Sequence, residues 1–389
     1  MFTKMLNIAK IPQLLLVLFF CFMLDNKQKI KRLDSKNMLG SIQSLGKQVE
    51  EVWGQAQRRV SKDGTRHDFA KSKIPASYKK IDNVVVLGMG GSALGAHLIK
   101  SVFLKELKIP VEIINGYSAP GFVSASSLVI ASSYSGSTEE VLTAVQNAKK
   151  RKAKIAVIAS GGKLVDWAKK NKVPSLVFST DNNPCGSPRM GLGYSIFGQI
   201  SLLANIGLLK FSSTEIKQAV STILKYNDLF GVNTVEANNP AKQSATSLQH
   251  KSVWFAASEH LAGNAHIAAN QMNENAKRFA GYFLIPELNH HLMEGMLYPE
   301  SNKQNIKFVL FESGLYDERA QKRYEITKQV LNKNGISYVA YRCKEKIALL
   351  QACELLVLCS YISFYSAMLQ GIDPTAIPFV DFFKEQLKK

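Results

Sequence analysis

The chain has 389 residues, of which 46% are hydrophobic and 20% charged, and its formal net charge is +19. This length and composition predict a globular protein with two domains of ordinary size and exclude a disordered chain. The Lys and Arg residues are spread along the sequence, and the local clusters at 149–154 and 169–172 contain no interleaved aromatic residues. Solvated helix ends explain these clusters better than a nucleic-acid surface does.

Cysteine and histidine spacing argues against metal and disulfide frameworks. The five cysteines form no C-x-x-C pair, and the seven histidines show no H-E-x-x-H or H-x-H cluster. This pattern is typical of a reduced, cytoplasmic chain and gives no support to a zinc ribbon, a disulfide scaffold or a metal-dependent mechanism.

The N-terminus carries an apolar run at 11–24, preceded by Lys4 and Lys10. The run is similar to a signal peptide but has no small-x-small cleavage site, and its 14 residues are short for a membrane-spanning helix. Two interpretations follow: a real membrane anchor, or an extension upstream of a true start at Met23. We therefore treat residues 1–22 as an extension.

The first α/β unit follows an amphipathic helix predicted at 34–59, within a helical segment that we assign to 23–78. Val84–Leu87 is predicted as a buried strand, and Gly88–Gly95 as a turn leading into a helix. The turn matches the dinucleotide fingerprint only in a variant form, with Glu112 as the acidic ribose partner. The glycines would in either case allow a ligand to approach the backbone closely.

Strands and helices then alternate, which predicts a parallel, doubly wound sheet in a domain at 79–235. The further strands are expected at 111–114, 128–131 and 155–158, and the helices at 95–103, 138–150 and 163–170. Ligands bind outside the carboxyl ends of such strands. The turn Gly90-Gly91-Ser92 and the loop Ser133–Thr138 should therefore open onto one crevice.

The loop Ser132–Glu140 offers small hydroxyl side chains and free backbone N–H groups at a helix N-terminus, an environment that favours an anion such as phosphate. Gly136 allows the turn to close. Ser137 and Glu140 also match a capping box, so the same residues are consistent with a helix start that binds nothing.

Arg189 follows Pro188 and precedes a helix predicted at 195–209. Its guanidinium group suits a forked contact with an anion, but an arginine at the protein surface is an equally good explanation. Ser212 and Glu215 predict a capping box for a helix that ends near Leu229.

The Gly-, Asn- and Pro-rich segment 231–240 marks a domain boundary, and the pattern then restarts. Strands are expected at 252–257, 307–311 and 337–341, and helices at 261–276, 317–333 and 347–370. Residues 236–389 therefore read as a second α/β domain, which we interpret as a diverged repeat of the first.

Two residues of the second half could perform acid–base chemistry. Glu274 stands among amides on an otherwise small and apolar helix, where a carboxylate could serve as a general base. His290 follows Gly281 and Pro286, so it cannot share a regular helix with Glu274 and must reach any common site by tertiary contact. A surface carboxylate and a core histidine are the competing explanations.

Taken together, these segments resemble the bifunctional phosphoglucose/phosphomannose isomerase family, whose members are built from two sugar-isomerase (SIS) domains. The similarity runs from about Met23 to the C-terminus. The segments that carry it are Gly88–Gly95, Ser133–Glu140, Pro188-Arg189, Asn273–Lys277, Pro286–His290 and Gly371–Thr375 with Lys384. The serine loop identifies only the broad superfamily, whereas the pairing of Asn273–Lys277 with Pro286–His290 is more specific.

The resemblance implies roles for individual residues. It assigns the sugar phosphate to Ser133, Ser135 and Thr138, with Gly90, Gly91 and Ser92 lining the site. Glu274 would transfer the proton and Arg189 would stabilise the enediolate. His290, supplied by the partner subunit of a homodimer, would open the pyranose ring, and Lys384 would help to close the site.

These roles imply a cofactor-free isomerase of hexose 6-phosphates. The enediolate carries no stereochemistry at C2, so one base can convert both glucose 6-phosphate and mannose 6-phosphate to fructose 6-phosphate. We expect a cytoplasmic enzyme that binds neither nucleic acid nor, unless residues 11–24 are a real anchor, a membrane. The alternatives are a non-catalytic SIS-domain regulator, for which no helix-turn-helix segment is evident, and a nicotinamide-dependent oxidoreductase, against which the serine loop argues.

The sequence departs from the family pattern at two positions. Ser137 stands where the family often has Asn, and His291 beside His290 leaves the identity of the ring-opening group open between the two.

Overall fold

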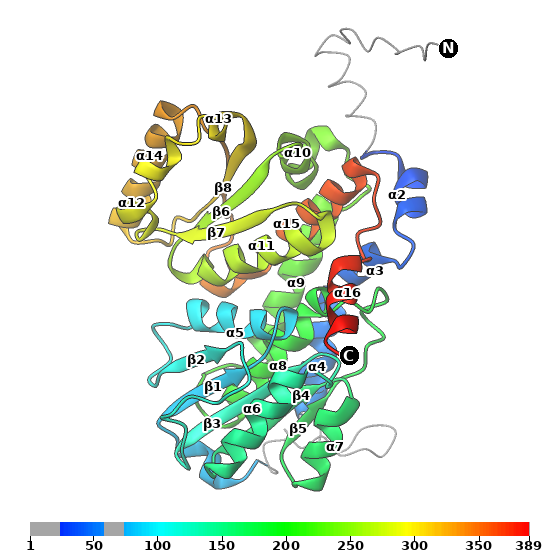
Figure 1. The fold of residues 1–389 in the computed structure, drawn as a ribbon, viewed down its shortest axis with the longest axis vertical. Coiled ribbons are helices and arrows are strands. Elements are labelled where there is room, and N and C mark those ends of the chain that lie inside the picture. The colour runs from blue at the N-terminus through cyan, green and yellow to red at the C-terminus, as the bar shows by residue number, and fades with distance from the viewer. Residues whose placement is uncertain (1–23, 58–73, 389) are drawn as a thin grey trace.

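The computed structural model describes residues 24–57 and 74–388 and contains two parallel sheets, one above the other in Figure 1. The apolar run at 11–24, apart from Leu24, and the expected start at Met23 lie outside the described residues. The first sheet has the order β2-β1-β3-β4-β5, and all its strand pairs are parallel. Its strands are β1 Asn83–Leu87, β2 Val111–Ile114, β3 Ser127–Ser133, β4 Lys154–Ala159 and β5 Ser175–Val177. Four of them confirm the predicted strands, and β5 was not predicted.

Helices cover both faces of the first sheet, as a doubly wound fold requires. Helices α6 (Glu139–Lys150) and α7 (Gly162–Lys170) bury one face in a separate apolar cluster. Helices α5 (Gly91–Val102) and α8 (Leu192–Asn205) cover the other face, and their apolar cluster continues into the second domain. The two domains therefore share a core on this face of the first sheet. Helix α5 begins at Gly91, four residues before the expected Gly95.

The N-terminal segment is not one helix. The structure has α2 (Lys27–Leu33), α3 (Met38–Gln43) and α4 (Leu45–Gln57), with a break at Ser44. Helix α4 packs on α8 and on α9 (Ser213–Phe230). The capping box that starts α9 is formed as predicted, with the side chains of Ser212 and Glu215 each bonded to the backbone at the helix start.

The second sheet repeats the strand order of the first. Its order is β7-β6-β8-β9, again all parallel, which corresponds to β2-β1-β3-β4. The strands are β6 Ser252–Ala257, β7 Ala280–Leu284, β8 Ile306–Glu312 and β9 Ser337–Arg342. Strand β7 was not predicted; it occupies the aromatic stretch after Arg278. The shared order supports the interpretation of the second half as a diverged repeat.

The helices of the second domain include one of membrane-spanning length. Helix α15 (Ala348–Gln370) has 23 residues, and its 18-residue apolar segment has a mean hydropathy of 1.6. This segment is entirely buried within the described chain, as expected for a core helix. The remaining elements are α10 Pro240–Ser247, α11 Ala262–Ala276, α12 Leu288–His291, α13 Asn302–Asn305, α14 Glu318–Lys333 and α16 Pro378–Gln386, with short 3₁₀ turns at 76–79, 188–190, 236–238, 259–261 and 294–296.

The two domains meet where α5 crosses α11. A Cβ atom at Gly263 of α11 would lie 2.4 Å from the Leu98 Cα of α5, so only glycine permits this approach. The crossing packs α11, the helix that carries Glu274, on α5, the helix that follows the carboxyl end of β1.

Candidate functional site

The loop after β3 is held closed by its own hydroxyl groups. The Ser133 hydroxyl accepts a hydrogen bond from the Gly136 amide at 3.1 Å and is 2.8 Å from the Thr138 hydroxyl. Gly136 has a φ of 65°, and a Cβ atom there would lie 1.7 Å from the Gly161 carbonyl oxygen. The predicted need for glycine at this turn is therefore confirmed.

The helix that follows the loop does not start with the predicted capping box. Helix α6 begins at Glu139, its N-cap is Thr138, and no side-chain hydrogen bond caps it. Ser137 is instead a loop residue whose amide donates to the Ser135 hydroxyl at 3.3 Å. The expected pairing of Ser137 with Glu140 is wrong because the helix begins one residue later than that motif requires. The loop is thus not explained as a helix cap alone.

The glycine turn after β1 is bonded directly to this loop. The Tyr134 amide donates to the Ser92 hydroxyl at 2.8 Å, and the Ser132 hydroxyl donates to the Ser92 carbonyl at 2.9 Å. Because β1 and β3 are parallel neighbours, both segments lie at one carboxyl edge of the sheet. The expected common location is confirmed.

Gly91 is required for contact with another part of the chain. A Cβ atom at Gly91 would lie 2.7 Å from the Pro188 carbonyl carbon and 2.8 Å from the Arg189 amide nitrogen. The first turn of α5 therefore packs against the backbone that presents Arg189. The expectation that the glycines provide close approach for a ligand does not describe Gly91, whose open side is filled by protein.

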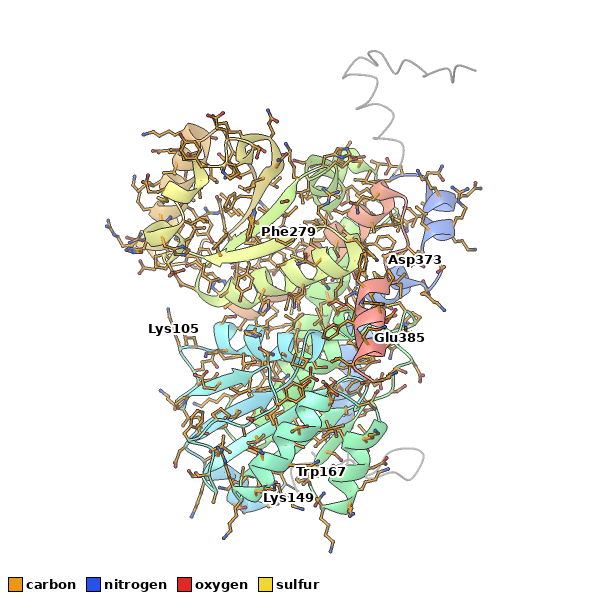
Figure 2. The ribbon with its side chains drawn as sticks, viewed as in Figure 1. Lys105, Lys149, Trp167, Phe279, Asp373 and Glu385 are labelled. Atoms are coloured by element: carbon orange, nitrogen blue, oxygen red, sulfur yellow. The ribbon has the colours of Figure 1, made fainter. Side chains whose placement is uncertain are left out.

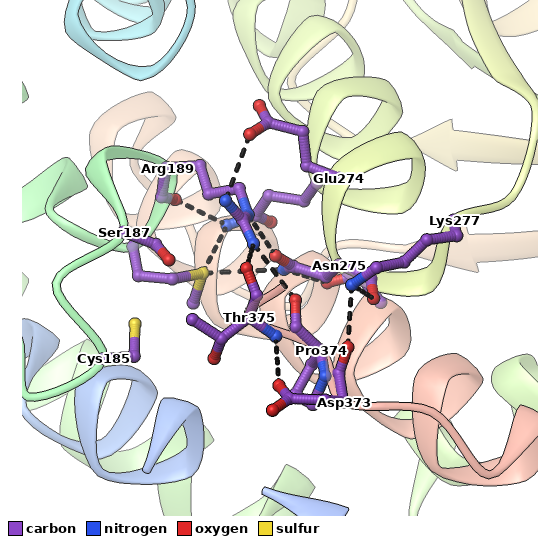
Figure 3. Close-up of polar contacts among 12 residues, drawn as sticks. Cys185, Ser187, Arg189, Glu274, Asn275, Lys277, Asp373, Pro374 and Thr375 are labelled. Atoms are coloured by element: carbon purple, nitrogen blue, oxygen red, sulfur yellow. Dashed lines mark hydrogen bonds and ion pairs between the residues drawn. The ribbon is translucent and has the colours of Figure 1, made fainter. Parts of the chain in front are cut away.

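Arg189 is buried, and its forked guanidinium group is bonded within the chain (Figure 3). Nε donates to the Asn275 side-chain oxygen, and Nη1 donates to Glu274 Oε2 at 3.1 Å. Nη2 donates to the carbonyls of Pro374 at 3.0 Å and Thr375 at 3.1 Å. Burial lowers the pKa of Arg189, while Glu274 opposes this shift. The interpretation as a surface arginine is wrong.

Glu274 is the partly exposed member of this network. Its side chain is 32% exposed, whereas that of Arg189 is 1% exposed, so the carboxylate lies between the buried cation and solvent. The backbone of Arg189 is held as well, because the Gln271 amide group donates to the Arg189 carbonyl at 3.3 Å. Helix α11 thus positions both ends of the arginine.

Sequence reasoning missed several residues that hold Arg189. Asn275 and Gln271 on α11 were noted only as neighbouring amides, and the carbonyls at 374–375 were not considered. Amides on a helix of small apolar residues are the available signal, because a buried amide needs polar partners. Backbone carbonyls carry no sequence signal.

His290 and His291 lie away from Glu274 within one chain. Both histidines are exposed on α12, which follows β7, and His291 pairs with Glu287 at 2.8 Å. Strand β7 starts beside the C-terminal end of α11, where the Asn273 side chain bonds Ala280. Because the strand advances by about 17 Å at roughly 3.3 Å per residue, α12 is carried to the opposite end of α11.

The remaining predicted residue, Lys384, is exposed on α16, the helix that follows the segment holding Arg189. The structure thus brings together Gly91, Ser92, the serine loop, Arg189 and Glu274, whereas His290 lies on α12, away from this group. No group of three or more potential metal ligands occurs in the two described ranges of the chain.

Two family models match the chain. Residues 77–172 match the SIS domain, and residues 237–387 match the bacterial phospho-glucose isomerase C-terminal SIS domain. The two matches fall on the first and the second sheet.

Curated relatives cover most of the chain. A bifunctional phosphoglucose/phosphomannose isomerase of Caldicellulosiruptor bescii is 32% identical over 79% of this chain and 90% of its own length. The protein of the same name from Aquifex aeolicus is 28% identical over 83% of this chain and 94% of its own length. A D-glucosamine-6-phosphate 4-epimerase of Sulfolobus acidocaldarius is 27% identical over 72% of this chain and 88% of its own length.

Solved structures share the fold. A hypothetical protein of Thermus thermophilus superposes with a TM-score of 0.70 over 93% of each chain at 15% identity. The C-terminal domain of glucosamine-fructose-6-phosphate aminotransferase from Francisella tularensis gives a TM-score of 0.62 over 86% of this chain and 97% of its own, also at 15% identity. These likenesses establish the two-domain α/β architecture.

Proposed function

Because the chain belongs to the bifunctional phosphoglucose/phosphomannose isomerase family, we propose that Glu274 is its catalytic base. The protein is a sugar-phosphate isomerase that interconverts glucose 6-phosphate and mannose 6-phosphate with fructose 6-phosphate. The proton moves between C1 and C2 through an enediolate.

The observation that carries this proposal is the Arg189–Glu274 ion pair at 3.1 Å, between the two domains. A carboxylate that shuttles a proton between C1 and C2 must be held in a fixed position and must reach the substrate. Glu274 has one oxygen on Arg189, and its side chain is partly exposed. Arg189 acts as the positioning cation of the base and adds positive potential where the enediolate oxygens develop charge.

The phosphate of the substrate is assigned to the first domain. We assign it to Ser133, Ser135 and Thr138 at the N-terminus of α6, of which Ser133 is buried and closes the loop, with Gly90, Gly91 and Ser92 forming the adjoining turn. A dianionic phosphate is stabilised at such a helix end by free amides and by the helix dipole. Because Gly91 packs on the backbone of Arg189, the turn links the phosphate end of the substrate to the reacting end.

The remaining assignments complete the proposal. The first SIS domain spans 79–235 and the second 236–389, with residues 23–78 as a helical segment before them. The enzyme works in the cytoplasm as a homodimer without a cofactor. His290 of each chain opens the sugar ring in the other chain's site, and Lys384 closes the site. The exposure of His290 on α12, away from Glu274, supports a shared site.

The test is isomerase activity in the variant Glu274→Gln. We expect formation of glucose 6-phosphate and mannose 6-phosphate from fructose 6-phosphate, followed separately in coupled assays, to fall by at least about 10³-fold for both products, since general base catalysis is lost. The matched control is Glu106→Gln, at an exposed glutamate after α5, which should keep full activity. Full activity of Glu274→Gln would refute the assignment of the base.

A second candidate reaction comes from the similarity to the D-glucosamine-6-phosphate 4-epimerase. Epimerisation at C4 exchanges no proton at C2, whereas an enediolate does. NMR of fructose 6-phosphate incubated in D₂O separates the two: deuterium at C1 or C2 supports isomerisation. Turnover of glucosamine 6-phosphate without isomerisation of fructose 6-phosphate would favour the epimerase. If the protein converts neither fructose 6-phosphate nor glucosamine 6-phosphate, the result would favour a non-catalytic sugar-phosphate regulator.

A further inference from the structure

A cavity lies at the edge of the second sheet where the strands begin. Its volume is about 700 Å³, and it is formed around the starts of β6, β7 and β8 and the end of α15. None of Arg189, Glu274 or the serine loop lines it. The lining residues are Gln249, His250, Lys251, Ser252, Lys277, Arg278, Phe279, Asn305, Leu369 and Gln370. We call this cavity the basic pocket.

The basic pocket carries positive charge without a carboxylate. His250, Lys251, Lys277 and Arg278 line it, and its lining includes no Asp or Glu. In the part of the chain that the structure describes, none of Lys251, Lys277 and Arg278 forms an ion pair with a carboxylate. The lining of the pocket therefore carries positive charge that no carboxylate of the lining neutralises.

Arg278 has unused hydrogen-bonding capacity. The residue is 8% exposed, Nη1 donates to the Leu248 carbonyl, and Nη2 donates to the Gln370 side-chain oxygen at 3.2 Å. Its buried Nε has no hydrogen-bond partner among the described residues. A buried guanidinium group normally has its charge paired, so the unpaired charge of Arg278, rather than its inaccessible Nε atom, suits an added anion.

Burial disfavours the charged forms of Arg278 and Lys277, and a bound anion would stabilise these charged forms. Burial lowers the pKa of Arg278, and burial followed by repulsion from Arg189 lowers the pKa of Lys277 to about 8. Lys251 donates one of its three N–H groups to the Gln304 carbonyl. A phosphate oxygen could accept from the others, because ammonium and guanidinium groups together form strong charge-assisted bonds with phosphate.

An exposed aromatic ring adjoins the cations. Phe279, labelled in Figure 2, is 71% exposed, and its ring contacts Trp254 edge-on at 6.2 Å. One face of a large apolar side chain is thus left open beside a cluster of cations. Such a pairing suits a ligand that has both phosphates and a flat ring.

We propose that the basic pocket binds a nucleoside diphosphate, with its phosphates on Lys251 and Arg278 and its base against Phe279. Binding is coupled to the site that holds Glu274 through Lys277, which lines the pocket and donates to the Asp373 carbonyl at 2.8 Å. The next two residues, Pro374 and Thr375, accept from Arg189. A ligand that attracts Lys277 therefore alters the segment that positions Arg189.

The test is calorimetric titration of the full chain with ADP and with pyrophosphate, without Mg²⁺. We expect a dissociation constant for ADP below about 1 mM and at least about tenfold weakening of both ligands in Lys251→Glu. Phe279→Ala should weaken ADP about fivefold and leave pyrophosphate unchanged. The matched charge reversal Lys322→Glu, on the exposed surface of α14, should change neither.

Two results would overturn the proposal. One is the absence of ADP binding to the unaltered protein up to about 5 mM. The other is binding that is lost in Ser135→Ala and retained in Lys251→Glu, which would place the diphosphate at the serine loop. The coupling between the basic pocket and the site that holds Glu274 is tested by the isomerase rates of the unaltered protein with and without ADP, which we expect to differ. Unchanged rates at saturation would exclude the link through Lys277 even if ADP binds.

Discussion

At the scale of single residues, the planar fork of Arg189 holds the candidate site together. Its Nε, Nη1 and Nη2 atoms bond four acceptors that belong to α11 and to the segment before α16. A lysine would keep the charge but could not reach these acceptors in several directions at once. The residue thus links chain segments that are far apart in sequence.

We therefore predict that Arg189→Lys lowers kcat by about 100-fold through misplacement of Glu274. The same variant should lose about 2 kcal/mol of the free energy of unfolding, because buried acceptors lose their donors. Coupled assays and urea unfolding measure the two effects. The control Arg319→Lys, at an exposed arginine on α14, should change neither quantity. An Arg189→Lys variant with unaltered kcat would contradict the positioning role.

His97 and His266 form a second pair at this scale, where α5 crosses α11. Their ring centroids are 4.4 Å apart, and the buried atoms His97 Nε2 and His266 Nδ1 have no hydrogen-bond partner among the described residues. Burial, and then the neighbouring His266 and Lys100, lower the pKa of His97 to about 4. Between this value and the ordinary pKa of 6.5, the unfolded chain binds more protons than the folded chain.

The free energy of unfolding should therefore fall as the pH decreases from 6.5 towards 4, and His97 should account for on the order of 1–2 kcal/mol of the loss after allowance for solvent screening. His97→Gln should reduce the loss measured by urea unfolding between neutral pH and the lower end of this range. His250→Gln, at an exposed histidine, should leave it unchanged. The same acid sensitivity in His97→Gln and the unaltered protein would refute the assignment.

At the scale of elements, the start of α5 positions the turn that carries Arg189. We predict that Gly91→Ala lowers kcat by about tenfold or more, because the new Cβ atom must displace the backbone at Pro188 and Arg189. Gly121→Ala, where nothing lies within 4 Å of the added atom, is the matched control and should be fully active. Steady-state kinetics of both variants test the prediction. Equal kcat values for Gly91→Ala and Gly121→Ala would show that the turn accommodates the added Cβ atom without displacing Arg189.

Sequence patterns located the central strands, because β1, β3 and β4 are continuous aliphatic runs that a buried parallel sheet requires. They missed β7, in which no residue is fully buried, since an edge strand has little apolar periodicity. They also placed the helix after the serine loop one residue early. The loop before α6 is closed by the Ser133 hydroxyl onto Gly136, a contact that a spacing motif does not contain.

The residues of the candidate site also fall into two groups: those that local sequence identified and those that only tertiary contacts define. The hydroxyl loop and Glu274 were identified from local sequence, because a helix start and an isolated carboxylate are local features. The environment of Arg189 was not, since its acceptors come from residues 85 to 186 positions away in the chain. Tertiary contacts of this kind are fixed by the packing of α5 on α11, which depends on Gly263.

At the scale of the whole molecule, the first domain supplies the serine loop, to which we assign the phosphate, and the second domain supplies Glu274. His290 does not fit this division within one chain, because α12 lies at the far end of α11 from Glu274. A second chain could place α12 over the exposed side of Glu274. In a dimer with twofold symmetry this exchange would occur at both sites.

Mixing two inactive variants tests this arrangement. Glu274→Gln and His290→Ala chains, unfolded together and refolded at equal concentration, should form heterodimers in which one site contains both intact residues. With random pairing, about a quarter of the sites are intact, so activity should return to about one quarter of that of the unaltered enzyme. His291→Ala in place of His290→Ala distinguishes the two histidines, since the histidine that opens the ring is the one whose loss is rescued. Dimers that form without regained activity would show that each chain builds its site alone.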